Sequence, residues 1–400
     1  MRLPFEQLRS WQPELTAKDS LRAGAGAEPR RILLVTPRYF PYSGGVENHV
    51  YQVARRLAQY GAKMTVLATD PSRQLPAHEE SNGVKIQRVR AWPAERDHYL
   101  APEIYPIITN GDWDVVHVQS YHTLVAPLAM VAAWRAGIPY VITFHGGGHS
   151  SRLRHALRPL QRLLLRPLLT RADRLVATAR FEIPFLARQL RLPDERFVFI
   201  PNGGDLLGVT ETAIGPVEAG LIVSIGRLER YKGHHRAIAA LPMILERRPD
   251  VRLWIMGTGP YESSLRELAQ TLGVADRVKI HSIPACERER MGRELSKAAL
   301  VVLFSEYETQ PMAVLEALAL GRPALVSDTS GLGELARQGL ASAVAPESTS
   351  AQIASAILEQ LHQPYVPPPI NLPTWDDCAA RLLALYDEII CCGRSPDRAT

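Results

Sequence analysis

Two glutamates near residue 310 stand among apolar side chains. Glu316 lies in the run Met312–Leu320, whose other members are alanine, valine, leucine and methionine, and Glu308 precedes it by eight residues. An unpaired carboxylate in such surroundings is costly to the fold unless a polar group meets it. Two interpretations are open at this point. The acids bind a ligand with hydroxyl groups, or Glu316 pairs with a structural arginine and Glu308 only complements a helix dipole.

A pair of cations follows an apolar strand pattern further upstream. Arg227 and Lys232 lie within Gly226–Gly233, directly after the run Leu221–Ile225. Open α/β folds bind ligands at the carboxyl ends of their strands, and an arginine fork with a mobile lysine suits phosphate oxygens. Two solvated loop cations are the alternative. Together with the glutamates, the pattern favours a site with a phosphate end and a hydroxyl end, which matches a sugar nucleotide.

Backbone groups are expected to complete that site. Pro311 suits the first turn of a helix, so we expect free N–H groups there that hold an anion or hydroxyl oxygens. The segment concerned comprises Thr309, Gln310, Pro311 and Met312. Gly44 and Gly45 let the backbone approach a ligand in front of a second predicted helix. Gly257-Thr-Gly259 resembles the start of a dinucleotide fingerprint but lacks the third glycine, which argues against a dehydrogenase.

Further polar residues occur in the strands of the first half. His145 directly follows the apolar run Tyr140–Phe144, at a position where such folds place chemistry. His117 lies inside a predicted strand and is expected to be packed or hydrogen-bonded. Asp112-Trp-Asp114 resembles a metal-binding D-x-D motif, but Asp114 opens a strand, so we expect a structural role and no metal site.

The segment Arg152–Arg171 contains six arginines and no acidic residue. Its arginines recur every four residues, at Arg154, Arg158, Arg162 and Arg166, and leucines form a second stripe. This pattern is typical of a basic amphipathic helix on an anionic membrane. Docking of the leucine stripe on the protein core is the alternative, and two prolines interrupt the pattern.

Composition restricts the class of protein. The 400 residues, 46% hydrophobic and 22% charged, predict an ordinary globular protein of two domains. A net charge of +5 permits an anionic substrate but does not demand nucleic acid. The four cysteines form neither a zinc motif nor a disulfide framework. The first 29 residues lack the apolar core of a signal peptide, and no run is long enough to span a membrane. We therefore expect a cytoplasmic protein, at most peripheral to the membrane.

Strand and helix patterns alternate in two series. A flexible arm (1–29) precedes a first domain (30–205), a second domain (206–373) follows, and a final helix (375–392) is assigned to the first domain. The predicted strands are 31–36, 63–68, 114–118, 140–144, 174–177, 197–200, 221–225, 251–256, 278–280, 300–304, 323–326 and 341–344. Helices between strands predict parallel sheets covered on both faces. Two such domains in series predict a ligand cleft between the carboxyl ends of their sheets.

These motifs, in this order, resemble the retaining glycosyltransferases of family 4 (group 1), which have the GT-B fold of two Rossmann-like α/β domains. The resemblance runs from about Arg31 to Tyr386. It rests on Gly44-Gly-Val-Glu47, Thr143-Phe-His-Gly146, Ala172-Asp-Arg174, Ile200-Pro-Asn-Gly203 with Asp205, Gly226-Arg-Leu-x-x-x-Lys-Gly233, Gly257-x-Gly-Pro260, Glu308-x7-Glu316, Gly331-Leu-Gly-Glu334 and Trp375.

The resemblance implies a role for each charged residue. Arg227 and Lys232 would bind the donor diphosphate, Glu316 the ribose hydroxyls and Glu308 the hydroxyls of the transferred sugar. His145 would meet the sugar or acceptor near the reaction centre. Further donor contacts are expected at Gly44, Gly45, Gly226, Gly257, Gly259, Thr309, Gln310, Pro311 and Met312. The family usually has small or aromatic residues after the first glutamate, so Thr309-Gln310-Pro311 leaves the donor sugar and base open.

The expected reaction is transfer of a hexosyl unit from a nucleotide-diphosphate sugar to a hydroxyl of a glycolipid or polysaccharide precursor, with retention. No metal or other cofactor is expected, because Arg227, Lys232 and helix N-termini supply the positive charge. The expected partners are the donor, the acceptor and an anionic membrane surface, with no nucleic acid. The alternatives are a sugar-nucleotide epimerase of the same fold and a non-catalytic glycan- or membrane-binding protein.

Overall fold

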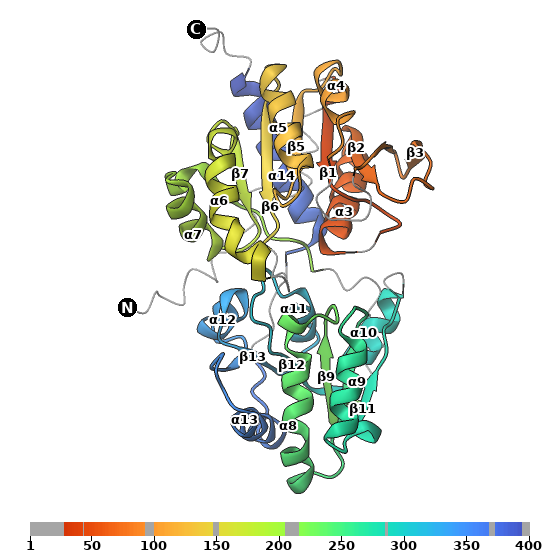
Figure 1. Ribbon diagram of the computed structural model, residues 1–400, viewed down its shortest axis with the longest axis vertical. Helices are drawn as coiled ribbons and strands as arrows, with labels where there is room; N and C mark the ends of the chain where they lie inside the picture. Colours follow the sequence, from red (N-terminus) through yellow and green to blue (C-terminus); the bar gives the residue numbers. More distant parts are fainter. Residues whose placement is uncertain are drawn as a thin grey trace. The chain divides into compact units, whose positions relative to one another are not determined.

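The computed structural model describes residues 28–42, 44–92, 100–146, 152–204, 216–284, 287–367 and 373–393, and the side chains of 152–159 and 392–393 lie outside the description. The chain divides into two compact units, each with its own sheet (Figure 1). The first comprises Met1–Gly146, Ala156–Gly203 and Pro373–Thr400, and the second comprises Gly147–His155 and Gly204–Leu372. The arm expected before residue 30 lies almost wholly outside the described residues.

The sheet of the first unit has the strand order β3-β4-β2-β1-β5-β6-β7-β8. The neighbours are parallel, except that β3 pairs antiparallel with β4. The strands are β1 (Arg31–Thr36), β2 (Lys63–Asp70), β3 (His78–Ser81), β4 (Val84–Arg90), β5 (Val115–Gln119), β6 (Tyr140–Phe144), β7 (Arg174–Ala177) and β8 (Phe197–Phe199). The order reverses between β1 and β5, and folds of this kind bind ligands at the carboxyl ends beside such a point.

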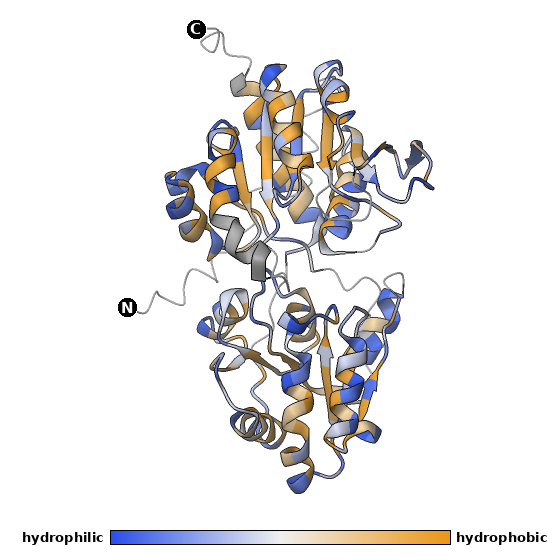
Figure 2. Cartoon of the chain, viewed as in Figure 1, coloured by the Kyte–Doolittle hydropathy of each residue, from blue (hydrophilic) through white to orange (hydrophobic). Residues whose placement is uncertain are grey.

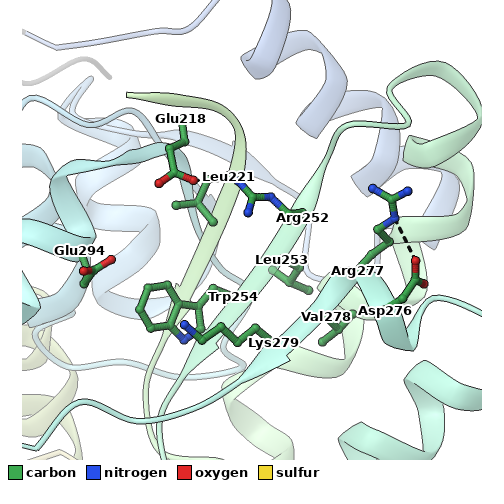
Figure 3. A pocket seen from close by; sticks show the side chains of 10 residues that line it. All are labelled: Glu218, Leu221, Arg252, Leu253, Trp254, Asp276, Arg277, Val278, Lys279 and Glu294. Atoms are coloured by element: carbon green, nitrogen blue, oxygen red, sulfur yellow. Dashed lines mark hydrogen bonds and ion pairs between the residues drawn. The ribbon is translucent and has the colours of Figure 1, made fainter. Parts of the chain in front are cut away.

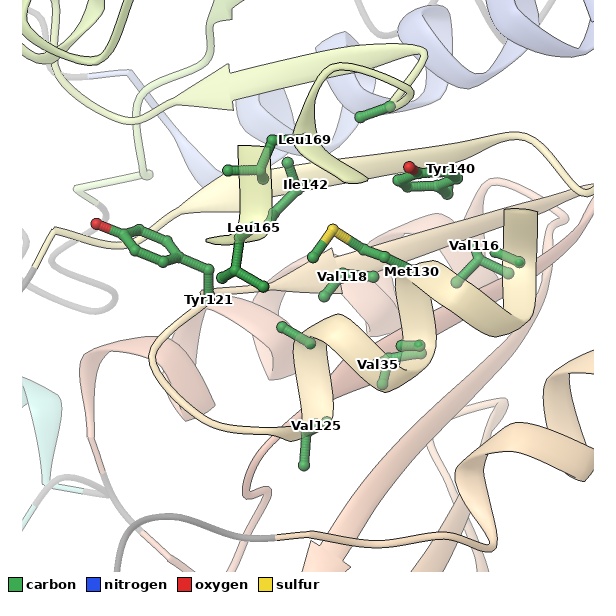
Figure 4. Close-up of a cluster of buried hydrophobic side chains, with 14 of the residues drawn as sticks. Val35, Val116, Val118, Tyr121, Val125, Met130, Tyr140, Ile142, Leu165 and Leu169 are labelled. Atoms are coloured by element: carbon green, nitrogen blue, oxygen red, sulfur yellow. The ribbon is translucent and has the colours of Figure 1, made fainter. Parts of the chain in front are cut away.

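Successive strand residues enter two different cores in this unit. Val35, Val116 and Ile142 pack against α4, α5, α6 and α7 on one face (Figure 4). Leu34 and Val115 pack against α3 and α14 on the other. The helices are α3 (Gly45–Gln59), α4 (Ile104–Thr109), α5 (Val125–Arg135), α6 (Arg152–Leu169), α7 (Glu182–Leu190) and α14 (Trp375–Gly393). Strands with both faces covered are apolar along their whole length, and Figure 2 shows them in orange.

The C-terminal helix α14 is fixed to the first unit by polar as well as apolar contacts. The buried guanidinium of Arg56 donates to Asp376 over 2.8 Å. The Tyr386 hydroxyl lies 2.5 Å from Nδ1 of His117. A Cβ atom at Gly203 would lie 2.2 Å from the backbone nitrogen of Trp375, so only glycine allows this helix to begin so close to the loop after β8.

The second unit contains a sheet in the order β11-β10-β9-β12-β13-β14, and its neighbours are parallel. The strands are β9 (Glu218–Ile225), β10 (Arg252–Met256), β11 (Val278–Ile280), β12 (Ala298–Leu303), β13 (Ala324–Ser327) and β14 (Ser342–Val344). Its helices are α8 (His234–Arg247), α9 (Glu262–Thr271), α10 (Arg288–Ser296), α11 (Met312–Ala319), α12 (Ser330–Arg337) and α13 (Ser350–His362). Ile222 and Leu253 pack under α8, α9 and α13. Val223 and Val326 pack on the opposite face against α10, α11 and α12.

Two features differ from the sequence-based expectation. The hairpin β3–β4 was not predicted, although Val84–Arg90 alternates buried and exposed residues. Its partner His78–Ser81 is polar and mostly exposed, as suits an edge strand that lacks any apolar signal. The helix α6 also runs without interruption through Pro159 and Pro167 to Leu169.

Candidate active site

Lys232 and Glu308 form an ion pair in the second unit. Nζ of Lys232 lies 2.5 Å from Oε1 of Glu308, and the two side chains are only 15% and 11% exposed. Ser305, which follows β12, donates its hydroxyl to the same carboxylate oxygen over 2.9 Å. The sequence pointed to both charged residues. It missed Ser305, because one serine at a strand end carries no distinctive signal.

Arg227 is held at the carboxyl end of β9 by its backbone. His234 is buried, and its Nε2–H donates to the Arg227 carbonyl over 3.3 Å, while Nδ1 lies 2.8 Å from the Ser224 hydroxyl. Burial lowers the pKa of His234 to about 4, so this ring is neutral at physiological pH. The Arg227 side chain is 66% exposed, with Nη2 2.7 Å from Glu229. An exposed cation, paired with Glu229, therefore stands on a loop that hydrogen bonds of His234 hold in place.

Glycines allow this loop to approach its neighbours closely. Gly233 has φ +74°, and a Cβ there would lie 2.0 Å from the carbonyl oxygen of Phe304. A Cβ at Gly257 would lie 1.9 Å from the carbonyl oxygen of Gly226, and one at Gly259 2.5 Å from that of Leu228. Gly233, Gly257 and Gly259 thus have a structural reason to be glycine, and contact of Gly226, Gly257 and Gly259 with a donor stays a prediction.

Glu316 pairs with an arginine that the sequence did not indicate. Oε1 of Glu316 accepts a hydrogen bond from Nη2 of Arg288, at the start of α10. Burial raises the pKa of Glu316, and the opposing charge of Arg288 lowers it. Of the two interpretations open at the sequence level, the pairing with an arginine is the one observed, and a ligand role of Glu316 remains a prediction.

The row of free N–H groups expected across Thr309–Met312 is wrong at two of its four residues. Pro311 has no N–H, and the N–H of Met312 donates to the carbonyl of Gln310 over 2.9 Å. Thr309 and Gln310 each have interaction partners within the protein. The N–H of Glu308 donates to Ser330 over 2.8 Å. The N–H of Met312 is therefore not free, and ligand contacts of Thr309 and Gln310 stay predictions.

His145 in the first unit follows β6, as expected. Its Nε2 lies 2.7 Å from Oε1 of Gln119, the last residue of β5. Burial, reinforced by His49, His117 and His122, holds the pKa of His145 well below its ordinary value. The sequence missed Gln119, since only the pairing of β5 with β6 brings the two strand ends together.

Two further histidines support this cluster. His49 on α3 lies 2.7 Å from Oδ1 of Asn202, and its ring packs edge-on against His145 at a centroid distance of 4.8 Å. Burial lowers the pKa of His49 to about 4 and that of His117 to about 3. His117 is buried between Tyr386 and Thr143, which confirms its predicted structural role.

Gly44 and Gly45 stand at the N-terminus of α3. Gly44 is extended, and its carbonyl accepts the N–H of Asn48 over 3.0 Å, while a Cβ at Gly45 would contact no other atom. Open space at Gly45 is compatible with an approaching ligand, and both assignments stay predictions. Asp114 accepts hydrogen bonds from the backbone and guanidinium of Arg31, which confirms its structural role.

The predicted basic face of α6 needs correction. Arg162 is buried with its guanidinium 5.6 Å from the Phe185 ring centre, and Nε of Arg166 donates to the Leu190 carbonyl over 2.6 Å. The side chains of Arg154 and Arg158 lie outside the described residues. Three leucines of this helix are exposed, namely Leu160, Leu163 and Leu164. Arg162 is buried on this helix because Phe185 of α7 covers that side.

One cavity, of about 230 Å³, lies elsewhere in the second unit (Figure 3). It is lined by the amino ends of β10 and β11, with Lys279 over the Trp254 ring at 3.7 Å. Arg252 pairs with Glu218 and Arg277 with Asp276. Two of its arginines are therefore paired with carboxylates of the same cavity, which lies at the amino ends of the strands, opposite the carboxyl ends that bear the candidate site.

Two further results concern the described residues as a whole. They include no group of three or more histidine, cysteine, aspartate or glutamate side chains with the arrangement of a metal site. The helices they form are too short or too polar to cross a membrane.

The two doubly wound sheets place the chain in the GT-B class of folds. Sucrose-phosphate synthase from Thermosynechococcus elongatus matches 91% of this chain and 100% of that chain, with a TM-score of 0.72 and 20% identity. HepE from Anabaena, solved in complex with UDP-glucose, matches 91% of this chain and 96% of that chain, with a TM-score of 0.65 and 18% identity. At these identities, the likeness shows the fold.

Sequence comparison defines the family. The model of glycosyltransferase family 4 matches residues 43–206, and that of the group 1 glycosyl transferases matches residues 215–371. The D-inositol 3-phosphate glycosyltransferase of Nocardiopsis dassonvillei is 29% identical over 379 residues, which cover 83% of this chain and 87% of that protein. The chain belongs to the group 1 glycosyltransferases of family 4 and is a glycosyltransferase.

Proposed function

We propose that this enzyme moves a hexosyl unit from a nucleotide-diphosphate sugar to a hydroxyl of a glycolipid or polysaccharide precursor, with retention at the anomeric carbon. The observation that supports this proposal most directly is the cluster of Lys232, Glu308 and Ser305, with Arg227 on the neighbouring loop. It combines cations for a diphosphate with a carboxylate for sugar hydroxyls. HepE, a structural neighbour, binds UDP-glucose, which supports this donor class.

The chemistry proposed for these groups is charge stabilisation. As the anomeric carbon–oxygen bond breaks, negative charge grows on the departing diphosphate, and Lys232 and Arg227 meet it with charged hydrogen bonds. The acceptor oxygen attacks from the same face, and its proton passes to the departing diphosphate. These side chains carry the positive charge that a metal would otherwise bring, so we propose a metal-independent reaction.

Nucleotide binding tests the donor site first. Incubation with UDP, GDP or ADP, or with their sugars, should raise the melting temperature for one base, equally in EDTA and in Mg²⁺. Ligand at about 100 times its Kd adds about 2.7 kcal/mol to the free energy of unfolding of the unit that binds it. The measurement is a thermal shift for each nucleotide, followed by NMR of the anomeric configuration of the product.

The outcomes separate the alternatives. A shift that requires Mg²⁺ contradicts metal independence, and an inverted anomeric configuration contradicts retention. An epimer formed from donor alone identifies a sugar-nucleotide epimerase. If no nucleotide shifts the transition and no sugar is transferred to any acceptor, the donor site proposed here is wrong.

We further propose that the enzyme works in the cytoplasm, at the inner membrane face, where a lipid-linked acceptor is held. The observation behind this proposal is the exposed stripe of Leu160, Leu163 and Leu164 on α6, exposed by 52%, 65% and 70%. An apolar helix face of this kind inserts at the boundary between headgroups and acyl chains. The absence of acidic residues from Arg152 to Arg171 favours an anionic surface.

Replacing Leu163 and Leu164 by aspartate should abolish pelleting with anionic vesicles, because two charges would enter the apolar face of α6. The measurement is the bound fraction on phosphatidylglycerol vesicles compared with phosphatidylcholine vesicles. Leu272→Asp, at an exposed leucine of the second unit, is the matched control and should pellet like the wild type. Failure of the wild type to bind anionic vesicles would refute a membrane role for this face.

A further inference from the structure

Gln119 is a hydrogen-bond partner of His145 to which the proposed reaction assigns no role. Gln119 ends β5, His145 follows β6, and the register Gln119↔Thr143 places the two residues on adjacent strand ends. The Gln119 side chain is buried, with Oε1 2.7 Å from Nε2 of His145. Ser120, the next residue, has φ +66°, a left-handed conformation that is uncommon for serine. Such backbone strain persists where the surrounding structure holds the residue in place.

The side-chain amide of Gln119 has one hydrogen-bond partner among the described residues, which is the ring of His145. Among the described residues its Nε2 atom is buried and has no hydrogen-bond partner. His49, anchored by Asn202, packs edge-on against His145 and limits rotation of that ring. Packing against His49 therefore fixes the plane of the His145 imidazole. The hydrogen bond to Gln119 determines which of its ring nitrogens carries the proton.

We propose that Gln119 is a positioning residue that fixes the tautomer of His145, with the proton on Nε2 and a lone pair on Nδ1. The amide oxygen of Gln119 is an acceptor, so the ring must donate through Nε2–H. A neutral imidazole with a donor on one nitrogen is an acceptor on the other. The inference rests on the proposed function in one respect, because the lone pair on Nδ1 would accept a hydrogen bond from a hydroxyl of a sugar or acceptor.

The electrostatic environment is consistent with a neutral ring. The titratable groups that act on His145 are His49 on α3, His117 in β5 and His122 after β5, each of which opposes a positive charge on it. Burial acts in the same direction and lowers the pKa of His145. At physiological pH, Nδ1 of the neutral His145 ring therefore accepts a hydrogen bond, and the ring does not act as an acid.

The tautomer is measured directly by ¹⁵N NMR of the histidine-labelled full chain, with His145→Asn to assign the signal. The wild type should show His145 protonated on Nε2 alone. Gln119→Leu should give a mixture of tautomers and lower kcat/KM about 10-fold, the effect of one hydrogen bond. Gln161→Leu is the matched control, since the side-chain amide of Gln161 donates to the Tyr121 carbonyl over 2.9 Å and not to the His145 ring.

A second variant distinguishes positioning from a purely structural role. Gln119→Glu supplies a carboxylate that still accepts from Nε2–H, so the tautomer should persist while the pKa of His145 rises. At low pH the ring would become an imidazolium without a lone pair, and kcat/KM should fall. Over the pH range in which both proteins stay folded, the wild type should lack this acid limb, and Gln119→Glu should recover activity as the pH increases.

Several results would overturn the inference. These are a wild-type ring protonated on Nδ1, an unchanged tautomer and kcat/KM in Gln119→Leu, or a Gln119→Glu pH profile identical to that of the wild type. If the wild type transfers no sugar, the proposed function fails, while the NMR spectrum still decides the tautomer. The two failures are therefore distinguishable.

Discussion

Lys232→Met should lower kcat/KM for sugar transfer roughly 10²-fold. The substitution removes one charged donor from the departing diphosphate, an interaction that strengthens as the bond breaks. It also leaves the Glu308 carboxylate, only 11% exposed, without its cation. Uncompensated burial of that charge should cost about 3 kcal/mol of the free energy of unfolding of the second unit.

A double variant separates the two effects. Lys232→Met with Glu308→Gln removes both charges, so the stability loss should largely disappear while kcat/KM stays low. Lys279→Met is the matched control, because Lys279 is a lysine of the same sheet that lies over Trp254, and its loss should leave kcat/KM unchanged. Transfer kinetics and urea unfolding measure the two quantities. Near-normal turnover of Lys232→Met would contradict the donor site.

Acid should destabilise the first unit steeply. His49 and His117 are buried and His145 is half-buried, and all three are neutral, with pKa values of about 4 for His49 and about 3 for His117 and a lowered pKa for His145. Between the ordinary histidine pKa near 6.5 and those folded values, the unfolded chain binds protons that the folded chain does not. The stability contribution is therefore present above about pH 6.5 and is lost as the pH falls. Each histidine contributes a slope of about 1.4 kcal/mol per pH unit.

Three such groups give a combined slope of about 4 kcal/mol per pH unit below pH 6. Urea titration between pH 4.5 and 7.5, with hydrogen exchange of the β5 peptide as the probe of the first unit, measures it. His117→Gln should reduce the slope by about one third, whatever it does to stability at neutral pH. His78→Gln, at an exposed histidine of β3, should leave it unchanged. A flat profile from pH 7 to 5 would show that these rings are not buried in neutral form.

Strand prediction succeeded where the sequence contains a continuous signal. Runs such as Arg31–Thr36 and Tyr140–Phe144 are apolar throughout because helices cover both faces of their sheet, and both are strands with those bounds. The polar edge strand His78–Ser81 has no such signal and was missed. The family, the GT-B fold and the glycosyltransferase activity followed from motifs that remain together in the chain.

Partners could not be predicted in the same way. Arg288 and Glu316 are separated by 28 residues, and Gln119 and His145 by 26 residues, and nothing local in the chain relates them. The N–H of Met312, expected to be free, donates to the Gln310 carbonyl instead, because a turn can satisfy its own donors in several ways and only its geometry decides which.

The helix α6 shows both what the local sequence determines and what only tertiary packing decides. Residue types and spacing determined that an amphipathic helix forms there, since its periodicity is a local property. Which stripe faces the solvent was decided by tertiary packing. Burial of the Arg162 stem against α7 and the bond from Arg166 to Leu190 leave Leu163 and Leu164 exposed. The sequence by itself determined the elements and the charged residues of the site, whereas side-chain partners depend on contacts between distant segments that only the folded chain brings together.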